Sequence, residues 1–404
     1  MNNDLDNPRI GLFNDVFPPI MDGVAVCVEN YAYWLQQKMG KVSVITPQAP
    51  NHHYDHDYEV LPYFSLPVPN RKPYRMGLPR LDFAFQRQLK AQQFGLVHAH
   101  CPFSSGKVAR RIARQQQCPL IATFHSKYKD DFRQSIPSDR IVNHIIKNVV
   151  HFFEEADEVW VPQYGVADVL RSYGYQGKIE VVPNGSDFTI ADADYEACHV
   201  AARQELGIEP TIPFFLFVGQ HILQKNLPFL IEALSLIKDI PFEMRFVGTG
   251  YAQEQLKAQV NQCGLQNKVK FMGPIYQREE LKTYYAAADL FLFPSRYDNA
   301  PLVMREAAAM HTPSVLLAGS TTADVVTDGV DAFVSSDDLR AFAFRIEEIA
   351  QNFQLMAKVG AQASHSLVRS WEDISSEVID RYNHVIQRKN PSAQLIQTHG
   401  ATLK

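Results

Sequence analysis

Cysteine is scarce and scattered in this sequence, and two other common patterns are missing altogether. The five cysteines among 404 residues form no closely spaced pairs, which argues against a disulfide framework and against a zinc finger. No run reaches the roughly 20 uncharged apolar residues that cross a bilayer. Residues 1–6 are polar and acidic rather than basic and then apolar, so no secretory signal is predicted. These absences favour a cytoplasmic protein.

Short β-branched or aromatic runs alternate with amphipathic helical patterns along nearly the whole chain. The expected strands are Arg9–Phe13, Lys41–Thr46, Leu96–His100, Pro119–His125, Glu158–Pro162, Lys178–Pro183, Pro213–Val218, Phe242–Val247, Val269–Met272, Asp289–Pro294 and Pro313–Leu317. The expected helices are Val24–Lys38, Ser105–Gln116, Ile141–Glu155, Tyr164–Tyr173, Leu227–Ile237, Ala252–Cys263, Arg278–Ala287, Leu302–Met310 and Trp371–Gln387. Continuous apolar strands separated by helices indicate an α/β protein with parallel sheets covered on both faces.

The alternating pattern breaks after Asn184-Gly185 and restarts at Pro213, beyond a polar, alanine-rich segment. A chain of this length is also too long for one ordinary core. We therefore predict two doubly wound, Rossmann-like domains that face each other across a cleft and are joined by a linker at residues 189–212. Ligand-binding loops are expected at the carboxyl ends of the strands in each domain. The polar tail at 389–404 is expected to fray.

Charge is unevenly spread, although the net charge is only −5. Between Arg71 and Arg114 there are ten basic residues and a single acid, Asp82. The apolar and aromatic residues between these charges are Tyr74, Met76, Leu78, Leu81, Phe83 and Phe85. The stretch is either an ordinary solvated face or a surface for an anionic membrane, to which each basic side chain contributes about 1 kcal/mol. Nucleic-acid binding is not predicted, because the chain as a whole is acidic and shows no reading motif.

Several residues of the first half stand where strands are expected to end. Gly23 is either a simple turn residue or a point where the backbone approaches a phosphate at a helix N-terminus. No G-x-G-x-x-G accompanies it, which argues against a dinucleotide dehydrogenase. His98 and His100 share a face of one strand, but no third ligand is spaced nearby, so no metal site is predicted. His125 is either a ligand contact or a structural histidine.

The second half shows a sharper arrangement of charged residues. Gly219 and Gln220 follow one expected strand, and Lys225 stands beside the start of the next helix. A cation and a helix N-terminus together suit a diphosphate. Asp298 follows another strand and Glu306 lies on the helix after it, where two carboxylates can hold the hydroxyls of a sugar and a ribose.

In their order along nearly the whole chain, these segments resemble the retaining glycosyltransferases of family 4. The matching segments are Pro18–Val24, Val182–Asp187, Phe217–Gly219 with Lys225-Asn226, Phe246–Gly250, Val269–Gly273, Ala288–Ser295 and Asp298–Glu306. Trp371 resembles the tryptophan that precedes the family's last helix. Any one match is weak, whereas the ordered set is specific. His100, residues 123–126 and the basic, aromatic first half look similar to the diacylglycerol glucosyltransferases of bacterial membranes.

The resemblance implies the GT-B fold. It implies an acceptor-binding domain at 1–188 completed by a returning helix at 371–388, and a nucleotide-sugar-binding domain at 213–370. The expected reaction is transfer of a hexose, with retention, from a nucleotide-diphosphate sugar to a hydroxyl of a membrane lipid or a cell-surface glycan. A UDP-sugar is the favoured donor, and neither a metal nor a cofactor is expected. A peripheral position at the inner face of the cell membrane would suit a lipid acceptor.

The resemblance also implies roles for individual residues. Those expected to carry catalysis are His125, Lys225, Asp298 and Glu306. Those expected to bind the donor are Gly23, Gly219, Gln220, Lys225, Asn299, Ala300, Leu302, Val303 and Glu306. Lys225 and the N–H groups of Gly23 and Gly219 would stabilise the departing diphosphate. His125 would contact the transferred sugar, Glu306 would bind the ribose, and Asp298 with Asn299 would hold the sugar hydroxyls.

The sequence departs from the family pattern at several of these positions. Gln220 replaces an arginine, which removes a charge and a bidentate fork, and Gln224 and Asp298 each replace a glutamate. Pro301 has no N–H to offer a sugar hydroxyl, and His311 replaces a glycine. Two alternatives therefore stay open: a scaffold that binds a glycan or a partner without turnover, and a nucleotide-sugar epimerase of the same fold.

Overall fold

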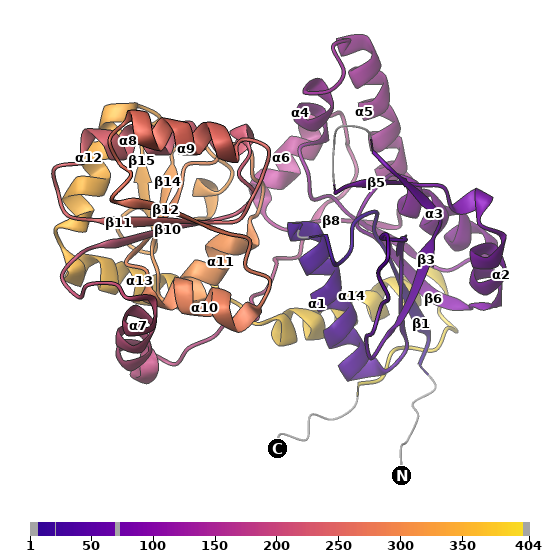
Figure 1. The fold of residues 1–404 in the computed structure, drawn as a ribbon. Coiled ribbons are helices and arrows are strands. Elements are labelled where there is room, and N and C mark those ends of the chain that lie inside the picture. The colour runs from indigo at the N-terminus through magenta and orange to yellow at the C-terminus, as the bar shows by residue number, and fades with distance from the viewer. Residues whose placement is uncertain (1–6, 21, 69–72, 399–404) are drawn as a thin grey trace. The chain divides into compact units, whose positions relative to one another are not determined.

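The computed structural model describes residues 7–20, 22–68 and 73–398 and divides into two units. The first unit consists of the chain up to Asn184 together with the chain from Trp371 onward, and the second unit runs from Gly185 to Ser370. Figure 1 shows their elements, with the chain coloured from indigo through orange to yellow. Each unit is built around its own sheet. None of the helices formed by the described residues is both long and apolar enough to cross a bilayer.

The first unit contains a parallel seven-stranded sheet in the order β3-β2-β1-β6-β7-β8-β9. Its strands are β1 (Arg9–Phe13), β2 (Val42–Pro47), β3 (Glu59–Tyr63), β6 (Phe94–Ala99), β7 (Leu120–Thr123), β8 (Glu158–Val161) and β9 (Glu180–Val181). β2 is buried at every residue, as expected for a strand covered on both faces. A separate antiparallel hairpin joins β4 (Ser65–Pro67) to β5 (Arg75–Gly77).

Helices connect these strands. They are α1 (Gly23–Met39), α2 (Phe83–Ala91), α3 (Ser104–Gln116), α4 (Tyr128–Arg133), α5 (Asp139–Glu154), α6 (Tyr164–Ser172) and α14 (Trp371–Lys389), with a short 3-10 turn η1 (Pro79–Leu81) before α2. The first helix shows how local chemistry sets such bounds. The Asp22 side chain accepts the Val24 N–H at 2.9 Å at its start, and Gly40 ends it with φ +79°, a conformation that favours glycine.

The second unit contains a parallel six-stranded sheet in the order β12-β11-β10-β13-β14-β15. Its strands are β10 (Phe214–Val218), β11 (Glu243–Val247), β12 (Val269–Gly273), β13 (Leu290–Phe293), β14 (Ser314–Leu317) and β15 (Phe333–Ser335). Its helices are α7 (Asp192–Leu206), α8 (Leu227–Leu236), α9 (Gln253–Gln262), α10 (Arg278–Ala287), α11 (Leu302–Ala309), α12 (Leu339–Ala350) and α13 (Phe353–Leu367), with 3-10 turns η2 (Leu223–Lys225) and η3 (Ala323–Val325). In both sheets the strand order reverses direction beside the first strand of the unit, which is where doubly wound folds bind ligands.

Every strand and helix expected from the sequence is present, and no bound differs by more than two residues. The linker expected at 189–212 is wrong, because α7 occupies Asp192–Leu206 and packs against α10. Its anchor is a buried arginine, Arg203, whose Nη1 lies 2.7 Å from the Asp289 Oδ2 and whose Nη2 donates to two backbone carbonyls. Because α7 is held mainly by a buried ion pair, its sequence has no clear apolar stripe from which a helix could be predicted.

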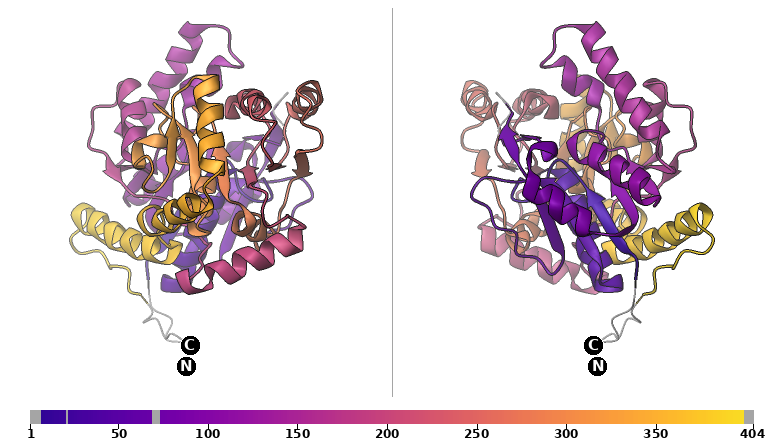
Figure 2. Two further views of the ribbon diagram at one scale, coloured as in Figure 1. Left: turned by 90° about the vertical axis from the view of Figure 1, so that its left-hand side faces the viewer. Right: turned by 90° about the vertical axis from the view of Figure 1, so that its right-hand side faces the viewer.

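The final helix docks onto the first sheet. The six residues predicted to form its apolar face are all buried; they are Trp371, Ile374, Val378, Ile379, Tyr382 and Val385. Burial of this face contributes on the order of 10 kcal/mol. Figures 1 and 2 show α14 as the yellow helix at the end of the chain.

A buried polar network joins this helix to the sheet. His98, on β6, has no exposed surface, and its Nδ1 lies 2.7 Å from the Tyr382 hydroxyl of α14. Its Nε2 lies 2.7 Å from the Thr123 hydroxyl of β7. Trp160 of β8 stacks on Tyr382 with ring centroids 5.7 Å apart. One imidazole thus links two strands and a helix, and both of its nitrogens are satisfied.

The segment after α14 is more ordered than a frayed tail. The Asn383 amide exchanges two hydrogen bonds with the backbone of Ile396, at 3.0 and 2.7 Å. The Asn7 amide does the same with the backbone of Gln397. The prediction of fraying is therefore wrong up to residue 398, and residues 399–404 lie outside the described residues.

We expect Tyr382→Phe to destabilise the protein by about 1–3 kcal/mol, because it leaves the buried His98 Nδ1 without its partner. Tyr164→Phe is the matched control, because that side chain is 78% exposed and such surface changes usually stay within about 0.5 kcal/mol. Urea denaturation of both variants measures the difference. Equal losses at the two positions would contradict the role assigned to the network.

Candidate functional site

The carboxyl ends of β10 and β11 bring two glycine segments against each other. Gly248 has φ +130°, and a Cβ added there would lie 2.0 Å from the carbonyl oxygen of Gly219. A Cβ on Gly250 would lie 2.3 Å from the carbonyl oxygen of His221. Backbone therefore packs directly on backbone at this end of the second sheet, and only glycine permits it. Gly219 directly follows β10, at the strand end where the sequence placed it.

Lys225 and Asp298 meet at the same end of the sheet. Lys225 ends η2 just before α8, and its Nζ lies 2.5 Å from the Asp298 Oδ1, with both side chains 14% exposed. The Nζ also lies 5.6 Å from the ring centroid of Phe293, the last residue of β13. The other Asp298 oxygen, Oδ2, is buried and has no hydrogen-bond partner within the described residues. The structure thus joins two residues that the sequence analysis assigned to separate parts of the donor.

Glu306 is buried on α11 and both of its oxygens are engaged. Its Oε1 accepts from the Arg278 Nη2 at 2.9 Å, and its Oε2 accepts from the Tyr285 hydroxyl at 2.9 Å. Arg278 also binds Asp187 with two nitrogens, at 2.9 and 2.5 Å, and its guanidinium lies 4.2 Å from the ring centroid of Phe188. Burial opposes the charged guanidinium, but the carboxylates of Glu306 and Asp187 outweigh it and raise the pKa of Arg278.

Arg278 and Tyr285 were not predicted as site residues. Both come from α10, one helix before Asp298, and a single arginine at the start of a helix carries no signal in the sequence. The tyrosine is fully buried; burial first, and then Glu306, raise the pKa of its hydroxyl well above the usual value. It therefore stays protonated and acts as a donor to Glu306.

The remaining residues of the second unit predicted to bind the donor stand next to Asp298 and Glu306 in the chain or on the segment before Lys225. Gln220 is half-buried between β10 and η2, Asn299 is buried, and Ala300 is half-buried before α11. Leu302 is buried at the first position of α11, and Val303 packs partly against the core of the second unit.

Gly23, unlike Gly248 and Gly250, is not required by close packing of the backbone. It is the first residue of α1, it is exposed, and a Cβ added there would meet nothing within 4 Å. Its φ is not among the positive ones, so neither the turn nor the packing demands a glycine. The local backbone does not explain Gly23, and open space at a helix N-terminus suits the approach of an anion.

The three strand-end histidines of the first unit divide into two kinds. His98 is committed to the network with Tyr382 and Thr123. His100 follows β6, and its Nδ1 lies 3.1 Å from the Nε2 of His125, which follows β7. Burial lowers the pKa of His125 to about 4, and burial with the neighbouring histidines lowers the pKa of His100 well below its usual value. At neutral pH both imidazoles are uncharged.

Two family models match the chain, one in each half. Residues 21–189 match "Glycosyltransferase Family 4" and residues 201–366 match "Glycosyl transferases group 1". The chain belongs to the family 4 glycosyltransferases. An alpha-monoglucosyldiacylglycerol synthase of Streptococcus pneumoniae is 27% identical over 76% of this chain and 70% of its own length. The enzyme of that name from Acholeplasma laidlawii is 23% identical over 94% of this chain and all of its own length.

Solved structures place this glycosyltransferase in the same fold. Sucrose-phosphate synthase from Thermosynechococcus elongatus superimposes with a TM-score of 0.78 at 21% identity, over 95% of this chain and all of the other. An Anabaena protein, HepE, solved with UDP and glucose, has a TM-score of 0.73 at 17% identity, over 93% and 99%. At these identities the likeness shows the GT-B fold, as expected from the sequence.

The Arg278 contacts predict a measurable effect on this glycosyltransferase. Arg278→Leu leaves the buried Glu306 beside Asp187 without a counter-charge and should cost about 2–4 kcal/mol of unfolding free energy. Adding Glu306→Gln should recover part of that loss. Arg340→Leu, at an exposed position of α12, is the control and should change little. Chemical denaturation of the unchanged protein, the two single variants and the double variant measures these free energies of unfolding. A double variant no more stable than Arg278→Leu would disprove the coupling between Arg278 and Glu306.

Proposed function

We propose that this glycosyltransferase moves a hexose from a UDP-sugar to a hydroxyl of a membrane lipid, with retention at the anomeric carbon. The observation that carries the proposal is the Lys225–Asp298 pair at the glycine-rich end of the second sheet. A cation and a carboxylate with one unsatisfied oxygen are the two groups that a sugar diphosphate requires at its two ends.

The donor would exchange partners with this pair. Lys225 would turn from one carboxylate to the diphosphate, which carries more charge. The Gly219 N–H, which was expected to assist it, donates instead to the Val247 carbonyl at 3.0 Å, so that part of the sequence prediction is wrong. Asp298 would then accept hydrogen bonds from sugar hydroxyls, together with Asn299. In this arrangement Lys225 and the start of α8 neutralise the leaving group, so the transfer is proposed to need no metal.

Glu306 can still accept hydrogen bonds from the ribose. Each carboxylate oxygen has two lone pairs, and Arg278 and Tyr285 occupy one on each oxygen. The remaining lone pairs can accept the two ribose hydroxyls. Arg278 and Tyr285 would act as positioning residues that hold the carboxylate in one orientation.

His125 is proposed to contact the transferred sugar. The bond between the anomeric carbon and the diphosphate oxygen breaks, the acceptor oxygen bonds to that carbon, and the proton of the acceptor hydroxyl passes to the departing diphosphate oxygen. Positive charge develops on the sugar ring during this step. A neutral imidazole, kept so by a pKa of about 4, can hydrogen-bond a hydroxyl without repelling that charge.

The names of similar proteins support the donor and the acceptor. HepE was solved with UDP and glucose, and the two relatives above are named for making monoglucosyldiacylglycerol. A lipid acceptor would require the protein to work as a peripheral protein at the inner face of the cell membrane.

An exposed apolar surface in the first unit supports membrane docking. Its side chains come from the β4–β5 hairpin, its flank, η1 and α2; they are Phe64, Leu66, Met76, Leu81 and Phe83, exposed from 42% to 83%. Leu66 and Met76 are direct partners across the hairpin, so they point to the same side. Phe85, which the sequence placed in this surface, is buried in the core instead.

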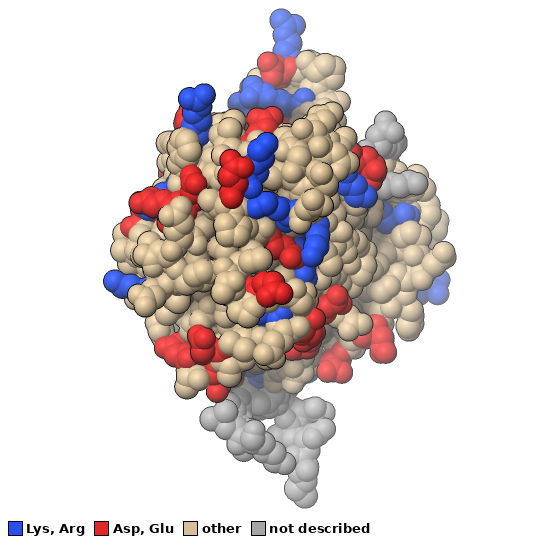
Figure 3. Space-filling model, turned by 60° about the vertical axis from the view of Figure 1, so that its left-hand side comes forward, with Lys and Arg blue, Asp and Glu red and all other residues tan. Residues whose placement is uncertain are grey.

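Part of the basic stretch is neutralised by an acid from outside it. Arg110 and Arg114 both pair with Glu155, while Arg71 and Lys72 lie outside the described residues. The basic side chains that remain exposed, with no ion pair within the described residues, are Arg80, Arg87, Lys90 and Lys107. On the face drawn in Figure 3, acidic and basic side chains are mixed over the upper part, whereas acidic ones predominate over the lower part.

A panel of nucleotide sugars tests the donor by isothermal titration. We expect UDP-glucose or another UDP-sugar to bind, and Lys225→Met to weaken binding by about 10- to 150-fold, the equivalent of a lost hydrogen bond to a charged group. Lys238→Met, at an exposed position, should bind as the unchanged protein does.

Because Lys225→Met also leaves a buried carboxylate unpaired, the double variant Lys225→Met/Asp298→Asn controls for stability. Unaltered affinity in a folded Lys225→Met variant would rule out the diphosphate role. Failure of every nucleotide sugar to bind at millimolar concentration would favour the scaffold alternative, to which Gln220 and Pro301 point, and product formed without an acceptor would favour the epimerase.

Co-sedimentation with vesicles tests the surface. Anionic vesicles should bind the protein more tightly than neutral ones, and added salt should weaken this binding. Leu81→Asp/Phe83→Asp should weaken it at least about 10-fold, since two apolar contacts are replaced by like charges. Phe344→Asp, exposed in the second unit, is the matched control. Equal binding to both kinds of vesicle, or to neither, would refute docking by this surface.

A further inference from the structure

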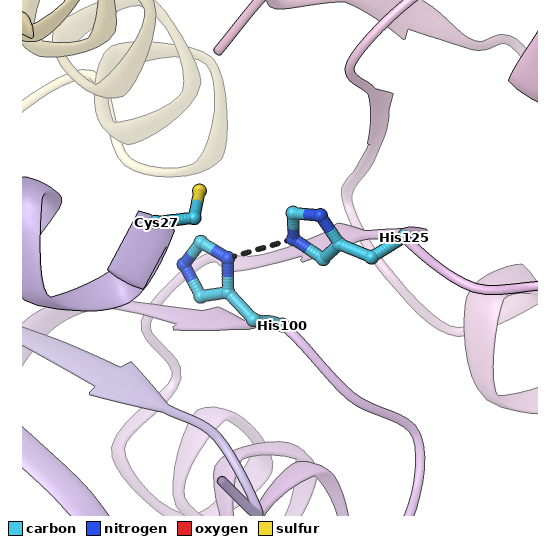
Figure 4. A group of neighbouring side chains, drawn as sticks. All are labelled: Cys27, His100 and His125. Carbon is cyan, nitrogen blue, oxygen red and sulfur yellow. Dashed lines mark hydrogen bonds between the residues drawn. The ribbon is translucent and has the colours of Figure 1, made fainter. Parts of the chain in front are cut away.

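Three potential metal ligands converge in the first unit from three different elements. Cys27 projects from the buried side of α1, His100 follows β6 and His125 follows β7. One ligand atom of each, a sulfur and two ring nitrogens, lies within 4.8 Å of the other two. Figure 4 shows the thiol and the two imidazoles gathered in one place, with the hydrogen bond between the histidines dashed.

These separations are close to those of a metal centre. Tetrahedral zinc, with bonds of about 2.0–2.3 Å, holds nitrogen and sulfur ligands about 3.3–3.6 Å apart. The two histidine nitrogens are already 3.1 Å apart. The Cys27 sulfur lies within 4.8 Å of both nitrogens, so closing the cluster around an ion requires the sulfur to approach them by at most about 1 Å.

The surroundings of the cluster favour a bound cation over an isolated thiol. Cys27 and His100 are each 1% exposed, and the Nε2 of His100 has no hydrogen-bond partner within the described residues. The Cys27 thiol points to the Asn184 Oδ1 at 3.5 Å, a weak interaction. The Asn184 oxygen lies beside the sulfur, where it could supply a fourth ligand.

We propose that Cys27, His100 and His125 form a binding site for a borderline-soft divalent cation of the zinc type. One thiolate and two imidazoles suit zinc or cobalt, whereas magnesium, calcium and manganese prefer oxygen. This metal site could not be predicted from the sequence, because the third ligand stands on a helix about 70 residues before His100.

The site would act as an inhibitory one. A divalent cation held by His125 would stand beside the sugar on which positive charge develops during transfer, so occupancy would oppose the reaction. This consequence rests on the proposed function of His125, whereas the binding itself does not.

Titration of the purified, chelator-treated full chain with cobalt tests the binding. One equivalent of Co²⁺ should produce a thiolate-to-cobalt absorption band and tetrahedral d–d bands, and zinc should displace it. Mutation of a residue that only hydrogen-bonds a metal ligand typically lowers metal affinity by about 10- to 100-fold. Removal of a ligand itself, by Cys27→Ser or His125→Gln, should therefore lower cobalt affinity by at least about 100-fold. Cys118→Ser, a buried cysteine of the same unit, is the matched control and should keep the full spectrum.

His125→Gln gives the answer independently should Cys27→Ser fail to fold, since His125 is only partly buried. Absence of cobalt binding up to millimolar concentration, or survival of the band in a folded Cys27→Ser variant, would overturn the proposal. So would unchanged affinity in His125→Gln.

A transfer assay with zinc tests the inhibition separately. Zinc should abolish the activity of the unmodified enzyme and a chelator should restore it, while Cys27→Ser keeps its basal activity and at least about 100-fold more zinc is needed to inhibit it. Cobalt binding without any effect of zinc on transfer would overturn the inhibitory role. If no donor is turned over at all, the proposed function fails while the cobalt spectra still decide the metal site.

Discussion

The first unit depends on a single buried imidazole. His98 has no exposed surface, yet both of its nitrogens are satisfied, one by Thr123 on the neighbouring strand and one by Tyr382 on the last helix. His100 and His125 each stand two residues beyond a member of this network, past the ends of β6 and β7. The same contacts that hold α14 therefore fix the two histidines to which we assign sugar and metal contacts, and structure and function share one set of hydrogen bonds.

Much of this fold could be predicted from the sequence, because parallel strands buried on both faces leave long apolar runs. β10, apolar at all five residues, is an example, and the six-residue apolar face of α14 is another. Other elements lack such a pattern. β3 lies at the edge of its sheet and contains Pro62. Proline is tolerated in an edge strand, but it argues against a strand when only the sequence is known. The helix α7 is held by Arg203 rather than by an apolar stripe.

Prediction of the candidate site was limited in a different way. Lys225, Asp298 and Glu306 could be selected because each stands near a strand end, where doubly wound folds bind ligands. Their pairing could not be read in advance, since the lysine and the aspartate are 73 positions apart. Arg278, Tyr285 and Cys27 had no signal, because an isolated arginine, tyrosine or cysteine in a helix is ordinary until tertiary contacts give it a partner.

The chain order of the two units has a consequence for how the protein is made. The first unit is assembled from the beginning and the end of the chain, while the second is one continuous segment between them. Domains generally fold as they emerge during synthesis, so the second unit has all of its strands and helices before α14 exists. Until then the apolar face of the first sheet that α14 covers stays open to water. The half of the enzyme that is synthesised first is thus the last to be completed, and a ribosome that stops short of Trp371 releases a chain with one finished unit and one that lacks its closing helix.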